Sequence, residues 1–379
     1  MGLALDLARR ALGRTAPNPP VGAVIVKDGV VVAEGWTQPP GSAHAEVHAL
    51  LAAERAGVGV AGATMFVTLE PCCHFGRTPP CTDAILKAGL GRVVVGTVDP
   101  FPLVAGKGIE QLRAAGLDVE VGIREAECRR LMLGFIRAHT EGLPEVTLKA
   151  AITLDGRIAS AYGEARWITG PAAREVSHRL RDQHDAIVVG IGTVLADDPA
   201  LTTRIQGGRD AIPVVLDSHL RTPTSAVVLQ RGTAIVYAGA GGSSRGQPEA
   251  RAADLSGAAT ADSDGNTSDF QRAADLVSAG ATVVRVPGGS GGVDVSAVLR
   301  DLAGRGLHRV LVDGGAHVHR SFLDAGCVDR IELFINARVL AGGPGFVAGE
   351  GYRLATAPSF RIDLVERVGD DLRLGLERG

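Results

Sequence analysis

The feature that most constrains this chain is a cluster of three cysteines, Cys72, Cys73 and Cys81, within one ten-residue segment. Thiolates and imidazole nitrogens are the ligands that Zn²⁺ prefers in proteins. Upstream of the cluster lies the sequence His44-Ala45-Glu46, which places a carboxylate two residues after a histidine. The fold of this chain is therefore expected to bring two segments that are distant in sequence to one metal ion.

This pattern is typical of zinc deaminases, in which H-x-E precedes P-C-x-x-C. The first half fits, since His44 and Glu46 are followed by Pro71-Cys72. The second half departs from the pattern, because Phe75 stands where the second cysteine is expected and the next usable thiolate is Cys81. We therefore expect His44, Cys72 and Cys81 to bind zinc. Glu46 is the expected catalytic residue, because a zinc-bound water needs a proton acceptor and donor.

Two other interpretations of the cysteine cluster are open. The cysteines could form a closed structural zinc site, with His74 or Cys73 as a fourth ligand. They could also be unligated thiols in a packed loop, since free cysteine is often simply buried. Glu46 favours the catalytic interpretation, because a structural zinc site needs no carboxylate at that position.

Length, charge and cysteine number restrict the class of protein further. A chain of 379 residues is too long for one ordinary domain, so we expect two. A net charge of −3 argues against nucleic acid or a membrane surface as a partner. No apolar run is long enough to span a bilayer, and the first residues lack the pattern of a secretory signal. Five cysteines, an odd number, suggest reduced thiols and a cytoplasmic location.

The first half alternates strand-like and helical patterns. Helices are expected at 3–12, 44–56, 82–88 and 108–115, and strands at 21–26, 30–33, 64–68, 92–98 and 119–123. Lys27-Asp28-Gly29 indicates a hairpin between the first two strands. Together these patterns predict a compact three-layer α/β domain that ends near Glu145.

The second half predicts another α/β sheet with crossover helices. Strands are expected at 146–158 (broken at 154–156), 186–191, 212–216, 233–237, 282–286 and 309–312, helices at 172–183 and 295–305, and a closing hairpin at 360–377. Residues 240–269 are rich in Gly, Ser, Ala and Asp and read as a flexible surface loop. Glycines follow several strands, as in Gly314-Gly315, and let backbone N–H groups approach a phosphate. By itself this predicts only a phosphate-bearing ligand.

The whole chain, apart from the loop at 240–269, resembles the bifunctional deaminase/reductases of riboflavin biosynthesis. Three segments carry the resemblance in the first half: Pro17-Asn18-Pro19-Pro20-Val21-Gly22, His44-Ala45-Glu46 and Pro71-Cys72-Cys73-His74-Phe75-Gly76-Arg77-Thr78-Pro79-Pro80-Cys81. The Gly-Arg-Thr-Pro-Pro-Cys loop accounts for the unusual cysteine spacing. In the second half the matching segments are Lys149 to Ala159, Trp167-Ile168-Thr169 and Gly192 to Arg204.

The resemblance implies a cytidine-deaminase-like three-layer α/β/α domain at 1–145 and a dihydrofolate-reductase-like α/β domain at 146–379. The first domain would deaminate a 2,5-diamino-6-ribosylamino-pyrimidinone 5′-phosphate with zinc. The second would reduce the ribosyl group of the product to ribityl with NADPH. Small phosphorylated pyrimidines are thus the expected substrates, and a homo-oligomer is the expected assembly.

The resemblance also implies roles for individual residues, which are carried over by motif position. Substrate binding is expected of Asn18, Lys149, Ala165, Arg181, Leu201, Arg204 and Asp313. NADPH binding is expected of Ala151, Ile158, Trp167, Thr193, Asp197, Gly315, Ala316, His317, Val318, His319, Arg320 and Ser321. Two positions depart from the usual family pattern, with Ala165 in place of Ser and Asp313 in place of Glu.

Two other classes of protein remain possible at this point. A deaminase of a nucleoside or a tRNA base would keep the zinc motif but would explain neither the long cysteine loop nor the second domain. A non-enzymatic protein with a structural zinc would hold its metal with four protein ligands.

Overall fold

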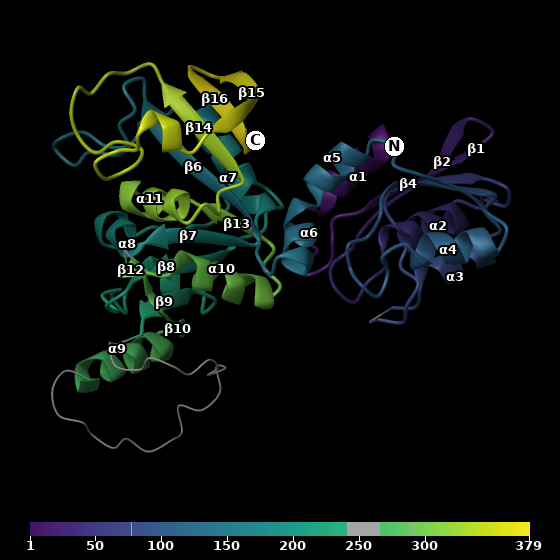
Figure 1. Ribbon diagram of the computed structural model, residues 1–379, viewed down its shortest axis with the longest axis horizontal. Helices are drawn as coiled ribbons and strands as arrows, with labels where there is room; N and C mark the ends of the chain where they lie inside the picture. Colours follow the sequence, from purple (N-terminus) through teal and green to yellow (C-terminus); the bar gives the residue numbers. More distant parts are fainter. Residues whose placement is uncertain (77, 241–265, 290–291) are drawn as a thin grey trace. The chain divides into compact units, whose positions relative to one another are not determined.

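The computed structural model describes residues 1–379 except for residue 77 and the segments 241–265 and 290–291 (Figure 1). The described chain divides into two compact units. The first contains residues Met1–Glu145 and Leu302–His308, and the second contains Val146–Asp301 and Arg309–Gly379. Each unit has its own sheet, and each is described below by itself.

The first unit is built on a five-stranded sheet in the order β2-β1-β3-β4-β5. β1 is antiparallel to β2 and β3, whereas β3, β4 and β5 are parallel. The β1–β2 hairpin turns at Asp28-Gly29, where both residues have positive φ, as the sequence predicted. The strands are β1 (Gly22–Lys27), β2 (Val30–Trp36), β3 (Thr64–Leu69), β4 (Arg92–Thr97) and β5 (Asp118–Val121).

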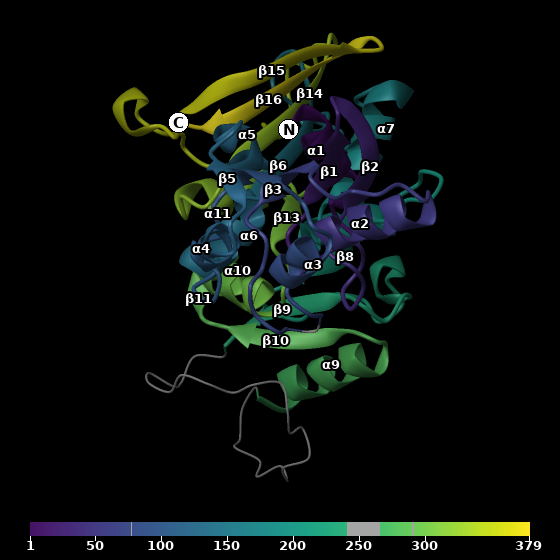
Figure 2. The ribbon, with the colours of Figure 1, turned by 90° about the vertical axis from the view of Figure 1, so that its right-hand side faces the viewer.

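Helices cover both faces of this sheet. The connections that carry the chain from β2 through β5 contain α2 (Ala45–Arg55), α3 (Cys81–Lys87) and α4 (Lys107–Ala114), which lie beside one another on one face (Figures 1 and 2). On the other face α1 (Gly2–Ala11) packs beside α5 (Glu125–Leu131). The unit also includes α6 (Leu133–Thr140). The predicted three-layer α/β/α architecture is confirmed.

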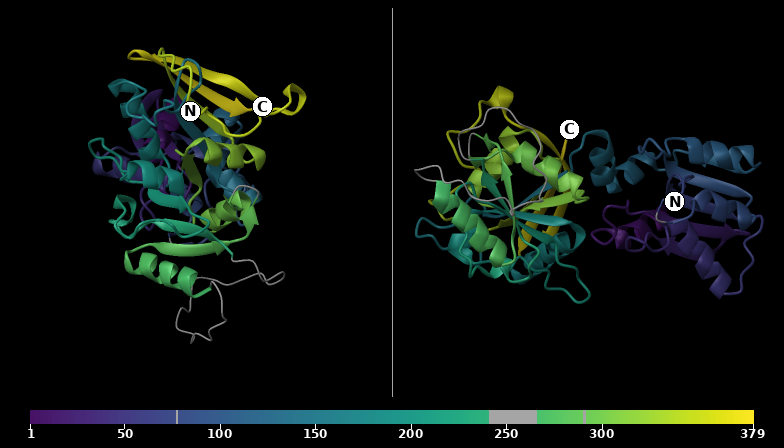
Figure 3. Two further views of the ribbon diagram at one scale, coloured as in Figure 1. Left: turned by 90° about the vertical axis from the view of Figure 1, so that its left-hand side faces the viewer. Right: turned by 90° about the horizontal axis from the view of Figure 1, so that it is seen from below.

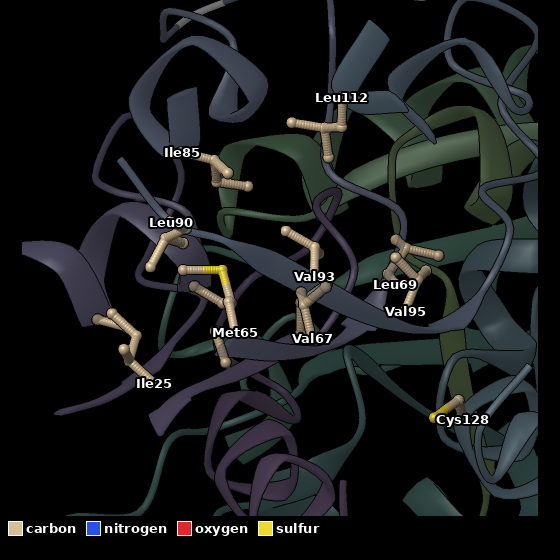
Figure 4. Packing of buried hydrophobic residues seen from close by; sticks show 14 of the residues in the cluster. Ile25, Met65, Val67, Leu69, Ile85, Leu90, Val93, Val95, Leu112 and Cys128 are labelled. Carbon is tan, nitrogen blue, oxygen red and sulfur yellow. The ribbon is translucent and has the colours of Figure 1, made fainter. Parts of the chain in front are cut away.

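Aliphatic side chains from the sheet and its covering helices form the core of the first unit. Met65 and Val67 of β3 and Val93 and Val95 of β4 are buried, and Ile85 of α3 belongs to the same cluster (Figure 4). Alternate residues of each strand point to this side, because side chains alternate across a sheet. The core thus fixes the carboxyl end of β3 and the start of α3, the two places from which the cysteines emerge.

The second unit contains a nine-stranded sheet in the order β10-β9-β8-β7-β13-β6-β14-β16-β15. β10, β9, β8, β7 and β13 run parallel to one another, and β6 is parallel to β14. The last two strands form an antiparallel hairpin on β14. The strands are β6 (Glu145–Thr153), β7 (Ala186–Gly190), β8 (Ile212–Leu216), β9 (Ile235–Gly239), β10 (Thr282–Val286), β13 (Arg309–Val312), β14 (Arg330–Asn336), β15 (Phe360–Val368) and β16 (Asp371–Arg378).

The helices of this unit lie on two faces of its sheet. The chain moves in one direction along the sheet from β6 to β10 and in the opposite direction from β10 to β14. Crossovers between parallel strands are nearly always right-handed, so the two directions use opposite faces. One face carries α7 (Pro171–Gln183), α8 (Ile191–Asp197) and α9 (Asn266–Ser278), and the other carries α10 (Val295–Gly304) and α11 (Ala316–Asp324) (Figure 3). The predicted α/β class is confirmed here as well.

Remaining elements are short. β11 (Gly288–Gly289) and β12 (Gly292–Val293) form a small two-stranded ribbon, and two single-turn 3₁₀ helices lie at Val227–Leu229 and Leu354–Thr356. Within the residues described, no helix combines the length and the apolar character needed to cross a membrane.

Several expectations need correction. The strand predicted at 146–158 ends at Thr153, because the chain turns at Asp155-Gly156. The loop predicted at 240–269 falls mostly on residues 241–265, outside the described part, but its last four residues open α9. The sequence did not reveal α5, α6, α8, α9 or β14.

Candidate active sites

Three of the predicted site residues of the first unit meet at the ends of two helices. His44 is the N-cap of α2, Cys81 is the first residue of α3, and Cys72 lies in the loop after β3. His44 Nδ1 lies 3.5 Å from Cys72 Sγ and 3.3 Å from Cys81 Sγ. One ligand atom from each residue falls within 4.8 Å of the other two. These three residues therefore face one common point.

This group fits a zinc ion in both chemistry and size. Zn–S bonds of about 2.3 Å and Zn–N bonds of about 2.0–2.1 Å in a tetrahedron place nitrogen and sulfur about 3.6 Å apart, close to the two distances above. With Nδ1 directed at the metal, Nε2 must carry the ring proton, and it lies 3.5 Å from the Thr78 hydroxyl. A ligating histidine commonly donates its other N–H in this way. Three protein ligands leave the fourth zinc position for water.

The surroundings of Cys72 favour loss of its thiol proton. Hydrogen bonding by the Cys81 thiol is the largest cause that lowers the pKa of Cys72, to about 4, and His44 acts in the same direction. The Cys81 main-chain N–H also points at Cys72 Sγ, at 3.4 Å. Backbone donors at a helix start favour a thiolate, which is the form that binds metal. The lowered pKa of Cys72 therefore favours the thiolate form that a metal ion needs.

Glu46 lies in the first turn of α2, beside the three ligands but outside their group. Its exposed fraction is only 4%, and burial is the main cause that raises its pKa to about 7, followed by the charge of Cys72. A carboxyl group with a pKa near neutrality can both accept and donate a proton at physiological pH. Its place matches the proton-transfer role expected from the sequence.

Cys73 and His74, the alternative ligands, do not join the group. Cys73 Sγ lies 3.9 Å from the carbonyl oxygen of Leu103, and His74 packs its ring against Phe101. Among the described residues the group holds three protein ligands, so the structure does not support a closed structural site with a fourth. The cysteine spacing, which departed from the usual motif, is accommodated by the loop between Cys72 and α3.

A residue that the sequence did not single out holds the surrounding loop. Glu70 is buried at the end of β3 and accepts four main-chain hydrogen bonds from the segment before and into α4. The donors are the N–H groups of Asp99, Gly106, Gly108 and Ile109, at 2.9–3.2 Å. The sequence could have indicated Glu70 by its position directly before Pro71-Cys72.

Asn18, a predicted substrate-binding residue, is not joined to the zinc group. Its N–H donates to the Thr15 carbonyl oxygen at 2.7 Å, and no side-chain hydrogen bond joins it to the zinc group in the described chain.

The second unit contains a cavity of about 1230 Å³. Pockets for single small ligands usually measure about 300–1,000 Å³, so this one has room for a dinucleotide and a second molecule. Its wall is formed at the ends of β6, β7 and β13 and by the helices that follow them. The predicted reductase residues that line it are Lys149, Ala151, Ile158, Ala165, Trp167, Arg181, Thr193, Asp197, Leu201, Arg204, Asp313, Gly315, Ala316, His317, Val318, His319 and Ser321.

Arg320 is the one predicted reductase residue that does not line the cavity. Its guanidinium donates to Asp324 at 2.7 Å and lies over the ring of Tyr352, 4.2 Å from the centroid. α11 begins at Ala316, so successive side chains of residues 315–321 point in different directions. Arg320 therefore stabilises the outer side of α11.

A charged triad occupies the inner wall of the cavity. Asp313 accepts a hydrogen bond from Lys149 Nζ at 3.1 Å and from Arg181 at 2.8 Å. Burial acts to raise the pKa of Asp313, but the charges of Lys149 and Arg181 outweigh it and hold this pKa well below its usual range. The triad carries two cations and one anion, and its net positive charge suits a phosphorylated ligand.

Trp167 is exposed into the cavity rather than packed in a core. Its exposed fraction is 59%, and the guanidinium of Arg174 lies 4.5 Å from the centroid of its ring. Arg174 also donates to the Thr169 carbonyl oxygen at 2.9 Å, which fixes the guanidinium over the indole. The ring is thus held on one side by a cation–π contact. This placement agrees with a ligand-binding role for Trp167.

The sequence did not identify every residue that lines the cavity. Arg174, Ser177 and His178 of α7 join Arg181 on its wall, and Ser218 lines it after β8. The α7 residues could have been found, because positions 174, 177, 178 and 181 have the spacing of one helix face. Ser218 follows a strand end, which is a common location of ligand contacts in α/β sheets.

The fold and the two sites define a two-domain enzyme that joins a zinc deaminase to an α/β reductase. A model of the cytidine and deoxycytidylate deaminase zinc-binding region matches residues 1–97, and a model of the RibD C-terminal domain matches residues 144–374. The chain is 38% identical to the riboflavin biosynthesis protein RibD of Bacillus amyloliquefaciens, covering 99% of this chain and 94% of the relative. Identity to the Aquifex aeolicus RibD is 39%, with 100% and 97% covered.

A solved structure agrees with these sequence matches. The diaminohydroxyphosphoribosylaminopyrimidine deaminase/5-amino-6-(5-phosphoribosylamino)uracil reductase of Thermotoga maritima superposes with a TM-score of 0.82 at 34% identity, covering 100% of this chain and 97% of that one. The chain belongs to the RibD family of riboflavin biosynthesis proteins. It is a bifunctional deaminase and reductase with Zn²⁺ and NADPH as cofactors, as the sequence resemblance implied.

Proposed function

We propose that the first domain hydrolyses an amino group from 2,5-diamino-6-ribosylamino-4(3H)-pyrimidinone 5′-phosphate. The second domain then reduces the ribosyl group, which yields 5-amino-6-ribitylamino-uracil 5′-phosphate. The observation that carries this proposal is the buried Glu46 beside a three-residue N/S ligand group with one position left for water. The reaction names printed for the Thermotoga maritima relative support the same pair of steps.

The deaminase step depends on proton transfer by Glu46. A bound zinc ion supplies acidity, because it lowers the pKa of a coordinated water to about 7. His44, Cys72 and Cys81 hold the metal, and Glu46 takes a proton from the attacking water. The same carboxyl group then delivers protons to the ring and to the leaving ammonia. A pKa near 7 suits both directions of transfer. Asn18 is proposed to contact the substrate.

The reductase step needs two anionic ligands in one cavity. NADPH supplies the hydride that is transferred to the sugar carbon. Thr193, Asp197 and Trp167 are proposed to bind the cofactor, together with Ala151, Ile158 and the cavity-facing residues of 315–321. The start of α11 at Gly315 presents N–H groups that suit its pyrophosphate. Lys149, Arg181 and Arg204 are proposed to attract the phosphorylated substrate, with Ala165, Leu201 and Asp313 beside it.

We also propose that residues 1–145 and 146–379 act as separate catalytic domains. Each has its own sheet, and every proposed zinc and proton-transfer residue precedes the boundary, although Leu302–His308 group with the first unit. The proposed substrates of both domains are small phosphorylated pyrimidines. No nucleic acid or membrane partner is proposed. None of the five cysteines forms a disulfide in the described structure, which supports a cytoplasmic setting.

A homo-oligomer is proposed on the basis of an open sheet edge. Among the described strands β15 pairs only with β16, so the other side of β15 ends the nine-stranded sheet. Ile362 and Val365 of β15 have exposed fractions of 58% and 63%. Apolar side chains on an unpaired edge favour association with another chain.

The proposed function is tested by incubating the protein with the diaminopyrimidinone phosphate and NADPH. Ammonia release and NADPH absorbance are followed in the same sample. We expect one ammonia for each NADPH oxidised, with ammonia appearing first. NADPH oxidation without ammonia release would contradict the proposed order.

A further inference from the structure

One face of α7 forms a continuous side of the reductase cavity. Arg174, Ser177, His178 and Arg181 all line it, at the spacing of neighbouring positions on a helix. Three of the four have evident partners. Arg174 lies over Trp167, Ser177 donates to the Ala173 carbonyl oxygen at 3.0 Å, and Arg181 pairs with Asp313. His178 lies between the contact with Trp167 and the charged triad.

The ring of His178 has one engaged nitrogen and one without a partner. It donates a hydrogen bond to the Thr202 main chain. Nδ1 is buried and has no hydrogen-bond partner in the described structure, so Nε2 must be the donor. A neutral imidazole that donates through one nitrogen accepts through the other. The cavity therefore contains a buried acceptor that lacks a donor.

The surroundings keep this imidazole neutral. Burial is the main cause that lowers the pKa of His178, and the charges of Arg181 and Arg204 lower it further. A neutral Nδ1 lone pair repels a phosphate oxygen but accepts a hydrogen bond from a hydroxyl group. Arg204 is exposed to the cavity, and its side chain makes no hydrogen bond or ion pair with the described residues, so it remains available to an anion.

We propose that His178 is a substrate-binding residue of the reductase that accepts a hydrogen bond, through Nδ1, from a hydroxyl group of the sugar chain. This inference rests on the proposed function, because it takes the substrate to be a phosphorylated ribosyl or ribityl compound. On this side of the cavity the arginines then attract the phosphate, and His178 binds a hydroxyl group of the sugar chain. An unpaired buried acceptor also disfavours ligands that lack a hydroxyl donor.

The test compares three probes in the full-length protein loaded with NADP⁺, by calorimetry. The first is ribitol 5-phosphate, which has a phosphate and hydroxyl groups. The second is pentyl phosphate, which lacks the hydroxyl groups, and the third is inorganic phosphate. In the unchanged protein we expect ribitol 5-phosphate to bind about ten-fold or more tightly than pentyl phosphate. Equal affinity of these two probes would overturn the inference without any substitution.

Substitution of His178 then assigns the hydroxyl contact. His178→Ala should weaken binding of ribitol 5-phosphate about ten-fold and raise the KM for the deaminated substrate by a similar factor. Binding of inorganic phosphate and the KM for NADPH should stay unchanged. His178→Asn, whose amide oxygen can replace Nδ1, should recover part of the loss and decides the question where the alanine variant folds poorly. Arg179→Ala, on the exposed side of the same helix turn, is the matched control.

Each other outcome overturns the inference. Equal loss of ribitol 5-phosphate and inorganic phosphate would make His178 a phosphate ligand. Unchanged binding of all probes would leave it a purely structural residue. Failure of the unchanged protein to reduce the deaminated substrate would instead contradict the proposed function, which the same kinetic assay detects separately.

Discussion

Lys149 and Asp313 form a partly buried ion pair in the reductase cavity, with Nζ 3.1 Å from Oδ1. β6 carries the lysine, and the aspartate directly follows β13, its neighbour in the sheet. Arg181 completes the arrangement on the other carboxylate oxygen. Asp313 thus neutralises one of two cations that would otherwise repel each other, and the group keeps one net positive charge.

The first prediction concerns this carboxylate. Asp313→Asn should lower the free energy of unfolding of the second domain by about 3 kcal/mol, because it leaves two partly buried cations without their anion. Asp313→Glu, which keeps the charge, should lose much less. Chemical denaturation of both variants measures the difference, and ammonia release by the first domain serves as the control. Equal stability of Asp313→Asn and the unchanged protein would refute the structural role.

The second prediction concerns the zinc ligands. Cys72→Ser and Cys81→Ser should each lose the metal, because Zn²⁺ strongly prefers a thiolate to a hydroxyl oxygen. Cys73→Ser is the matched control, since it changes a neighbouring thiol outside the group. Metal content per chain is measured after dialysis. Zinc loss in Cys73→Ser with retention in Cys81→Ser would show that the ligands are wrongly assigned.

The third prediction concerns NADPH. Asp197→Ala should raise the KM for NADPH about ten-fold, a loss of about 1.4 kcal/mol in binding, while ammonia release continues unchanged. Asp197 also lies 3.5 Å from Arg166, an exposed pair that contributes little to stability. Arg166→Ala is therefore an informative companion variant. A parallel fall in both activities would indicate a folding defect and remove the support for an NADPH contact.

The fourth prediction is that the two chemistries separate near Glu145. A fragment of residues 1–145 should bind zinc and release ammonia without NADPH. Residues 146–379 should reduce the deaminated product but ignore the diamino compound, because replacing an amine by a carbonyl exchanges a donor for an acceptor. A folded, zinc-loaded fragment of residues 1–145 that deaminates only when the second fragment is added would show that the boundary divides one catalytic site.

Local patterns were sufficient to predict much of the fold. The β1–β2 hairpin followed from Asp28-Gly29, and the place of Glu46 in the first turn of α2 followed from helical spacing. Both depend on residues that are close in sequence. The α8 helix was missed because Gly190 and Gly192 resemble a phosphate loop, and β14 was missed although Gly326 marks a turn before it.

Contacts between residues distant in sequence could not be predicted from local patterns. The triad of Lys149, Arg181 and Asp313 unites three elements that no short motif connects. Family resemblance suggested all three residues, but only the folded chain shows that Asp313 pairs with both cations. Likewise, helical spacing places His178 and Arg181 on one face, but the unpartnered Nδ1 becomes visible only when Thr202 is placed beside the ring.

The central claim is that one chain performs deamination first and reduction second, at two different sites. The most direct measurement is NADPH oxidation by the Glu46→Gln variant, with its zinc content confirmed, on the diamino substrate and on the deaminated substrate. Glu46→Gln should lose deamination by about two orders of magnitude or more, the scale of general acid–base catalysis. NADPH oxidation should therefore nearly vanish with the diamino substrate and remain normal with the deaminated one. Normal oxidation with the diamino substrate, or loss with both in a folded and zinc-loaded variant, would contradict the account.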